Sequence, residues 1–178
     1  MTRYSAVALF SHDLERVVLI HKLRPAWQAG KANFPGGKVE AAEMGTTGCR
    51  CGGECTWCLT GAHIRCAVRE VREETGLELT IGAMLHFCTL RFRGRGDGSA
   101  SECRFYCAVG DVELARTMES EPVFVADVDD VLDGQVIDGN AKTLPTMGNL
   151  PWLVAMARQR LRGDVEWRPG YVVEEVAQ

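Results

Sequence analysis

The sequence lacks several features that would place a protein in a membrane or on nucleic acid. It contains no run of 18 apolar residues, so no transmembrane helix is predicted. The N-terminal segment, MTRYS, lacks the pattern of a signal peptide. Positive charge is not in excess either, because the formal net charge is −4, and this argues against a role in coating nucleic acid or lying on a membrane surface. We therefore expect a cytoplasmic protein whose partner is a small molecule rather than a nucleic-acid polymer.

Internal repeats and linker-like segments are also missing. The 178 residues are therefore expected to form one domain over residues 1–178, which is long enough to bury a proper core. Eight cysteines are many for a cytoplasmic chain. Four of them stand in apolar contexts and are expected to pack as small hydrophobic side chains. These are Cys66, Cys88, Cys103 and Cys107.

A helix that carries three clustered carboxylates is predicted in the middle of the chain. Glu70, Glu73 and Glu74 are spaced i, i+3 and i+4, so a helix places them on neighbouring faces. Carboxylates this close repel one another, and a hard divalent cation such as Mg²⁺ or Mn²⁺ would offset the repulsion. For these three residues alone, a solvated acidic face is the alternative. Thr60 is expected to cap the start of the helix and Gly76 to end it.

A glycine-rich segment upstream completes the pattern. It reads GGKVEAAE from Gly36 to Glu43, and the helical segment reads REVREETGL from Arg69 to Leu77. Together they resemble the Nudix box, written G-x5-E-x7-R-E-U-x-E-E-x-G-U with U an aliphatic residue. In the family seven residues separate the two halves, whereas 25 separate Glu43 from Arg69 here. The box is therefore expected to carry an 18-residue insertion, residues 44–61.

The resemblance implies the Nudix fold, an α/β/α sandwich around a mixed β-sheet. It also implies Mg²⁺- or Mn²⁺-dependent hydrolysis of a nucleoside diphosphate linked to another group. The pattern of apolar and turn-forming residues fits this architecture. We expect strands at 4–10 and 16–21 (a hairpin), 32–34, 77–81, 83–91, 103–109 and 122–126, a helical turn at 128–132, and a helix at 150–161.

Roles for the acidic residues follow from the resemblance. The expected metal ligands are the Gly36 carbonyl, Glu70, Glu73, Glu74 and Glu121. Glu70 is either a ligand or the base that deprotonates the attacking water. Glu121 and Glu119 lie outside the box, just before a late strand. They are candidates because some members of the family recruit a carboxylate from outside the box. A position in a solvated loop is the equal alternative for both.

Two further residues of the box, with Glu70, make up the expected catalytic set. Arg69 is expected to hold a carboxylate in place through a forked hydrogen bond rather than to touch the substrate. Glu43 would complete the acidic cluster.

The segment just before the box, WQAGKANF from Trp27 to Phe34, resembles the MutT-type branch of nucleoside triphosphate pyrophosphohydrolases. We expect a (d)NTP substrate, including oxidised ones, with ADP-ribose, a nucleotide sugar or a non-catalytic sensing module as alternatives. Asn33 offers both a donor and an acceptor to a base edge. The candidates for stacking on a base are Trp27, Phe34 and Trp152, and those for phosphate contacts are Lys22, Arg24 and Lys38, with packing or solvated positions as the alternative for each.

The insertion is rich in cysteine. Cys49, Cys51, Cys55 and Cys58 lie in the sequence CRCGGECTWC, and four thiolates can bind a structural Zn²⁺. A metal would staple a segment too short to form a core of its own. Only three residues separate the two cysteine pairs, so local disulfides and a mobile loop with free thiols remain alternatives. His63 is a candidate substitute ligand, with an exposed position at the start of the helix as the alternative.

Overall fold

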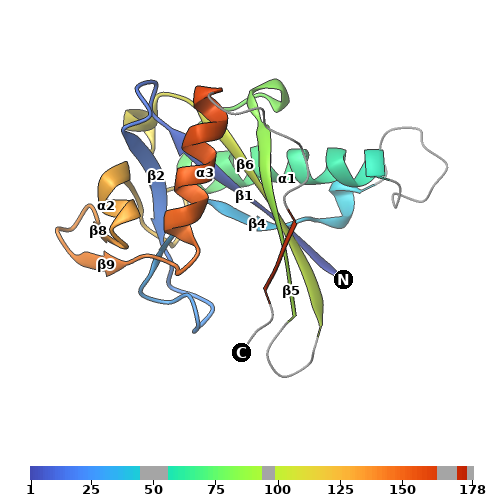
Figure 1. Cartoon of the computed structure of the whole chain (residues 1–178), viewed down its shortest axis with the longest axis horizontal. Helices are drawn as coiled ribbons and strands as arrows, with labels where there is room; N and C mark the ends of the chain where they lie inside the picture. Colours follow the sequence, from blue (N-terminus) through green and yellow to red (C-terminus); the bar gives the residue numbers. More distant parts are fainter. Residues whose placement is uncertain (45–55, 94–98, 164–171, 176–178) are drawn as a thin grey trace.

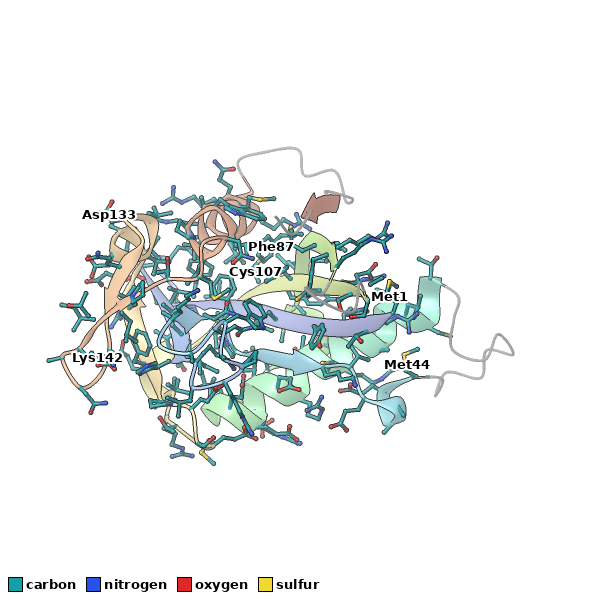
Figure 2. The ribbon with its side chains drawn as sticks, turned by 90° about the horizontal axis from the view of Figure 1, so that it is seen from below. Met1, Met44, Phe87, Cys107, Asp133 and Lys142 are labelled. Carbon is teal, nitrogen blue, oxygen red and sulfur yellow. The ribbon has the colours of Figure 1, made fainter. Side chains whose placement is uncertain are left out.

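The computed structural model of the protein describes residues 1–44, 56–93, 99–163 and 172–175. Helices cover both faces of a mixed β-sheet (Figure 1, Figure 2). The long helix α1 (Thr56–Thr75) packs on one face, and α3 (Leu150–Arg162) packs on the other, beside the short helix α2 (Val128–Leu132). The predicted α/β fold with a mixed sheet is therefore confirmed.

The sheet contains both parallel and antiparallel pairs. Among the described residues, eight strands form it in the order β10-β5-β6-β1-β2-β3, with β4 pairing β1 and β7 pairing β2. The central strand β1 runs parallel to β6 and antiparallel to β2 and β4. The strands are β1 (Thr2–Phe10), β2 (Arg16–His21), β3 (Ala32–Asn33), β4 (Gly36–Lys38), β5 (Leu85–Arg93), β6 (Ala100–Val109), β7 (Val123–Asp127) and β10 (Val172–Glu175).

Shorter elements complete the fold. A two-stranded hairpin of β8 (Gln135–Ile137) and β9 (Thr143–Pro145) lies beside α2. It is tied to the end of β2 by an ion pair between His21 and the buried Asp138, 3.4 Å apart. The 3₁₀ turns are η1 (Ala41–Glu43), η2 (Ile81–Ala83) and η3 (Val112–Leu114).

The core is divided by the sheet into two layers. Along β1, Val7 and Leu9 pack into the layer under α1, whereas Ala8 and Phe10 pack into the layer under α3. All four side chains are fully buried, because a central strand with helices on both faces has no solvent-facing side. Phe87 lies in the α3 layer, between the sheet and that helix in Figure 2.

Helix α1 begins earlier than predicted. Thr60 is inside the helix and donates its side-chain hydroxyl to the Thr56 carbonyl at 2.9 Å, so it does not cap the start. The first turns of α1 therefore come from residues 56–61, which were assigned to the insertion. The predicted end is confirmed, because Gly76 follows the helix with a φ of +72°.

One predicted strand is wrong. Residues 77–80 have no regular structure, and Ile81 enters the turn η2 with 54% of its surface exposed. The β-favouring side chains of this segment have no neighbouring strand to pair with, so their propensity is not realised. The tail, whose structure the sequence left open, contributes β10, which pairs in parallel with β5.

The four cysteines predicted to pack as small hydrophobic side chains do so. Cys66, Cys88 and Cys107 are buried, and Cys103 is half-buried against the α3 layer. The expected zinc ligands Cys49, Cys51 and Cys55 lie outside the described residues, while Cys58 lies in α1 and is buried.

No described helix is both long enough and apolar enough to cross a membrane.

Candidate active site

The two halves of the carboxylate motif meet where β4 runs beside β1. Gly36 and Gly37 pair with Ala6 and Ser5 of β1, and α1 crosses directly over them. A Cβ on Gly37 would lie 2.2 Å from Oε1 of Glu70, and a Cβ on Gly36 would lie 2.3 Å from the Ser5 carbonyl oxygen. Only glycine lets the strand approach both neighbours this closely.

Arg69 joins the acidic residues of the two halves. Its Nη1 lies 2.8 Å from Oε1 of Glu70 and 2.8 Å from Oε2 of Glu73. Its Nε donates to Oε1 of Glu43 at 3.0 Å, and its Nη2 donates to the Lys38 carbonyl at 3.2 Å. The guanidinium therefore bridges three carboxylates, whose charges it offsets only in part, and fixes the start of the box against α1.

Glu43 is held from both sides. It ends the turn η1, and its Oε2 accepts a hydrogen bond from the Glu40 backbone N–H at 2.7 Å. Its other oxygen accepts from Arg69. Although acidic, it is buried, so these two bonds compensate for its removal from water.

Glu74 is the most buried carboxylate of the helix, with 7% of its surface exposed. Its Oε2 accepts a hydrogen bond from the Gly36 N–H at 2.7 Å, and its Oε1 lies 3.9 Å from the Lys22 ammonium. Burial raises the pKa of Glu74 to about 8, aided by the charges of Glu70 and Glu119 and opposed by Lys22 and the Gly36 hydrogen bond. The anionic form of this side chain is thus unfavourable where it stands.

Glu70 is in a similar position. Burial raises the pKa of its carboxyl above the usual range, Arg69 acts against this, and the charges of Glu73 and Glu119 add to it. Two neighbouring carboxylates with raised pKa values mark a place where extra positive charge would be stabilised.

The two acidic residues outside the box differ from each other. Glu119 is exposed, yet its charge contributes to the raised pKa of both Glu70 and Glu74, so it lies near enough to act on these carboxylates. Glu121 is half-buried and its carboxylate accepts hydrogen bonds from the backbone N–H groups of Leu23 and Arg24 while pairing with Lys22.

The donor set suits a hard divalent cation. Carboxylate oxygens and a glycine carbonyl are the ligands that Mg²⁺ and Mn²⁺ prefer, and the buried Glu70 and Glu74 would be relieved by such a charge. In the part of the chain that the structure describes, no three acidic, histidine or cysteine side chains converge on one point, because Arg69 lies between Glu43, Glu70 and Glu73.

Some of the candidate substrate-binding residues are exposed, and others pack in or against the core. Arg24 and Trp27 lie on the loop after β2 and are exposed, Trp27 by 59%. Lys38 is exposed at the end of β4. Phe34, by contrast, is 2% exposed and packs in the α3 layer, so its ring is core and does not present a stacking face. Trp152 also packs against that layer, from α3.

Asn33 is partly occupied by local contacts. Its side-chain oxygen accepts from the Phe34 N–H at 2.9 Å, and its amide nitrogen lies 3.5 Å from the Gln28 side-chain oxygen. One donor and one acceptor position therefore remain for a ligand.

His63 does not stand at an exposed helix start, as the sequence suggested. It is fully buried in α1, where its Nδ1 lies 3.0 Å from the Ser5 hydroxyl and 3.1 Å from the Tyr4 carbonyl. Its Nε2 lies 3.8 Å from Glu102, a buried residue of β6 that sequence reasoning did not single out. Burial and the charge of Arg104 lower the pKa of His63 to about 4.

Glu102 carried no usable signal in the sequence, since a charge on a strand normally faces solvent. Here it is buried and accepts hydrogen bonds from Arg91 and Arg104, both at 3.1 Å. These bonds outweigh its burial and lower the pKa of the Glu102 carboxyl. This polar group lies under the first half of α1, apart from the carboxylates of the second half.

A family model, the NUDIX domain, matches residues 1–147 of the chain. Among solved structures, the NUDIX domain of Shewanella oneidensis NrtR complexed with ADP ribose is 19% identical and superposes with a TM-score of 0.61, covering 89% of this chain and 87% of that one. A MutT protein from Bacillus halodurans is 18% identical with a TM-score of 0.59, covering 99% and 91%.

The same NrtR protein complexed with a 27mer DNA gives 19% identity and a TM-score of 0.61, covering 90% of this chain and 62% of that one. At these identities the likeness concerns the fold. No curated protein matches the sequence.

Proposed function

The chain belongs to the NUDIX domain family, and on that basis we propose that it hydrolyses a pyrophosphate linkage in a nucleotide. The observation that carries this proposal is the contact of Gly36 and Gly37 with the carboxylates of Glu70 and Glu74. Twenty-five residues separate the two halves of the motif. The two halves nevertheless lie in contact. The substrate we propose is a (d)NTP, including oxidised ones, cleaved to the monophosphate and pyrophosphate.

The reaction is proposed to use Mg²⁺ or Mn²⁺. The Gly36 carbonyl and the carboxylates of Glu70, Glu73 and Glu74 would hold the ion. When bound, such an ion stabilises negative charge that develops on the phosphate oxygens. Glu121, also expected as a ligand, is less suited, because three donors already engage its carboxylate.

The protein's own residues would position the groups and move the proton. Arg69 keeps Glu70 and Glu73 in fixed orientations and links them to Glu43. Water must lose a proton as it attacks phosphorus, and a carboxylate with a raised pKa is a better acceptor than an ordinary one. Glu70 is the first candidate for this base, as the alternative to its role as a ligand, and the exposed Glu119 is the second, because its charge acts on the same cluster.

Substrate binding is proposed to use the loop after β2. Lys22, Arg24 and Lys38 would meet phosphate oxygens, and the exposed Trp27 would stack on the base. Asn33 would contribute its remaining donor and acceptor to the base edge. The nucleotide is proposed to bind without a nucleic-acid polymer, in a single domain located in the cytoplasm.

A panel of substrates tests the proposal. Purified protein is incubated with Mg²⁺ and (d)NTPs, oxidised dGTP, ADP-ribose and nucleotide sugars, and release of pyrophosphate and monophosphate is measured. We expect turnover of a (d)NTP, abolished by Glu74→Gln, with a circular dichroism spectrum unchanged from the wild type. Undiminished turnover by Glu74→Gln would remove Glu74 from the site.

A second substrate class is favoured by the fold likeness to a protein crystallised with ADP ribose. Faster turnover of ADP-ribose or a nucleotide sugar than of any (d)NTP would select that class. No turnover of any compound, together with saturable nucleotide binding, would indicate a sensing module and overturn the enzyme assignment.

Zinc in the insertion is a separate proposal. Cys49, Cys51, Cys55 and Cys58 would supply four thiolates next to the start of α1, where Cys58 lies. A metal at this point would hold the end of the insertion to the helix.

A further inference from the structure

The segment that follows β2 is fastened by a side chain at the point where its strand pairing stops. Strands β2 and β7 pair up to Ile20 and Val123, and the His21 N–H then donates to the Pro122 carbonyl at 2.8 Å. Beyond this the backbone ladder ends, and the Glu121 side chain takes over as the acceptor for the donors that come next.

Glu121 binds three consecutive residues. Its Oε1 accepts from the backbone N–H of Leu23 at 2.8 Å and from that of Arg24 at 3.1 Å. Its Oε2 pairs with the Lys22 ammonium. Both carboxylate oxygens are thus engaged, and the side chains of Lys22 and Glu121 are only 12% and 11% exposed. Charged hydrogen bonds in such a sheltered place are stronger than exposed ones.

The loop that leaves from Lys22 returns to its starting point. Lys22 donates its N–H to the Lys31 carbonyl at 2.9 Å, and Gly30 donates to the Lys22 carbonyl at 2.8 Å. Inside the loop the Lys31 ammonium donates to the Trp27 carbonyl at 3.0 Å. Trp27 therefore sits, 59% exposed, on a closed loop whose base is the residue that Glu121 holds.

The same base reaches the carboxylate site. The Lys22 ammonium lies between Glu121 and Glu74, 3.9 Å from Oε1 of the latter. One cation is therefore shared by the buried carboxylate of α1 and the residue that fastens the loop. A fixed distance between the loop and the carboxylates follows from this arrangement.

We propose that Glu121 is a positioning residue that fixes the Lys22 ammonium and the Trp27 loop against the carboxylate site, and so controls the binding of the nucleotide. This rests on the proposed function. The role differs from that of a metal ligand, because both carboxylate oxygens of Glu121 already bind donors of the protein. Glu119, which is exposed and whose charge acts on Glu70 and Glu74, is left as the acidic residue of this segment that can take part in the chemistry.

Steady-state kinetics on the best substrate of the panel test the proposal. Glu121→Gln keeps an acceptor oxygen for Leu23 but loses the charge that holds Lys22. We expect KM to rise about tenfold, the size expected for one lost charged hydrogen bond, and kcat to change by less than about twofold. A fall in kcat with a shifted Mg²⁺ requirement would identify Glu121 as a metal ligand and overturn the proposal.

Lys22→Met provides a test from the other partner. The contacts of Glu121 with Lys22, Leu23 and Arg24 are called the clamp. If Lys22 acts through the clamp, the double variant with Glu121→Gln should have a KM close to that of Lys22→Met alone, because both changes break the same Lys22–Glu121 ion pair. Fully multiplied effects would mean that the two residues act independently. The control is Asp130→Asn, a change at an exposed residue of α2, which should leave KM and kcat unchanged.

Limited chymotrypsin digestion separates failure of the clamp from failure of the enzyme assignment, because it needs no turnover. Glu121→Gln and Lys22→Met should both be cut after Trp27 several times faster than the wild type and Asp130→Asn, as mapped by mass spectrometry. Equal rates in all four proteins would refute the clamp even in an active enzyme. Faster cutting in a protein that hydrolyses nothing would retain the clamp and reject the enzyme. Thermal melts identify any variant that fails to fold, and the other clamp variant then decides.

Discussion

Gly37 and Gly36 show how much a single methyl group can decide at this site. The nearest atoms to an added Cβ on Gly37 belong to the Glu70 carboxylate, the far end of a flexible side chain. The nearest to one on Gly36 belong to the backbone of Ser5 and Ala6, which cannot move aside. The two glycines should therefore tolerate substitution differently.

We predict that Gly37→Ala lowers turnover by on the order of a hundredfold because it displaces Glu70, while the free energy of unfolding falls by only about 1 kcal/mol. Gly36→Ala should instead destabilise the fold by about 3 kcal/mol or more, since the sheet must open. Urea unfolding and kinetics on both variants give these numbers. Gly148→Ala, with nothing within 4 Å of the added Cβ, is the control. Equal losses of stability in the two site variants would contradict the geometry.

Glu74 predicts a pH dependence of stability in the absence of metal. The pKa of Glu74 is about 8 in the folded protein and about 4.5 when unfolded. The folded state thus holds a proton that the unfolded state releases, so the contribution of Glu74 to stability is greatest below about pH 4.5 and falls as the pH rises towards 8. Subtracting the curve of Glu74→Gln isolates this contribution.

Urea unfolding between pH 5 and 9 in the presence of a chelator measures it. The wild type should lose stability relative to Glu74→Gln, by an amount on the order of a few kcal/mol, and added Mg²⁺ should reduce the loss because the ion binds the anion. Parallel curves for the two proteins would show that Glu74 ionises normally.

At the scale of elements, the two halves of α1 carry chemically different groups. Its second half carries the carboxylates, and its first half lies on the buried polar group of His63, Ser5 and Glu102. Apolar residues such as Ala67 and Val71 hold the helix to the sheet.

The buried His63 of α1 predicts that the protein loses stability in acid. The pKa of His63 is about 4 in the folded protein against 6.5 when unfolded. Below pH 6.5 the unfolded chain takes up a proton that the folded one refuses, so stability is lost as the pH falls towards 4. The direction is opposite to that of Glu74. A His63→Gln variant should lack this loss, measured by thermal melts between pH 4 and 7; the same slope in both proteins would assign the effect to another group.

At the scale of the whole molecule, 25 residues separate Glu43 from Arg69, and they include the proposed cysteine-rich insertion. Closing a longer loop costs little additional entropy, which is why the halves can meet across it. If the four cysteines of the insertion act together, protein purified without chelator should contain about one zinc per chain by elemental analysis. Replacing Cys49 and Cys51 by serine should remove it. A metal-free protein of equal thermal stability would end the zinc proposal.

Several parts of this protein follow from the sequence alone. The helical spacing of Glu70, Glu73 and Glu74, the stop at Gly76 and the apolar stripe of α3 all depend on neighbours within a few residues, so local physics settles them. The family follows from this same local pattern.

Tertiary structure decided the rest, because burial and long-range partners have no local signal. Whether an ionisable side chain is removed from water depends on segments far away in the chain: β4 for Glu74, β6 for His63, and the loop after β2 for Glu121. Phe34 became core and Trp27 stayed exposed for the same reason, although both are aromatic and stand seven residues apart. The sequence identified the groups of the site, and the packing of the sheet against α1 determined which of them share Arg69 and which share Lys22.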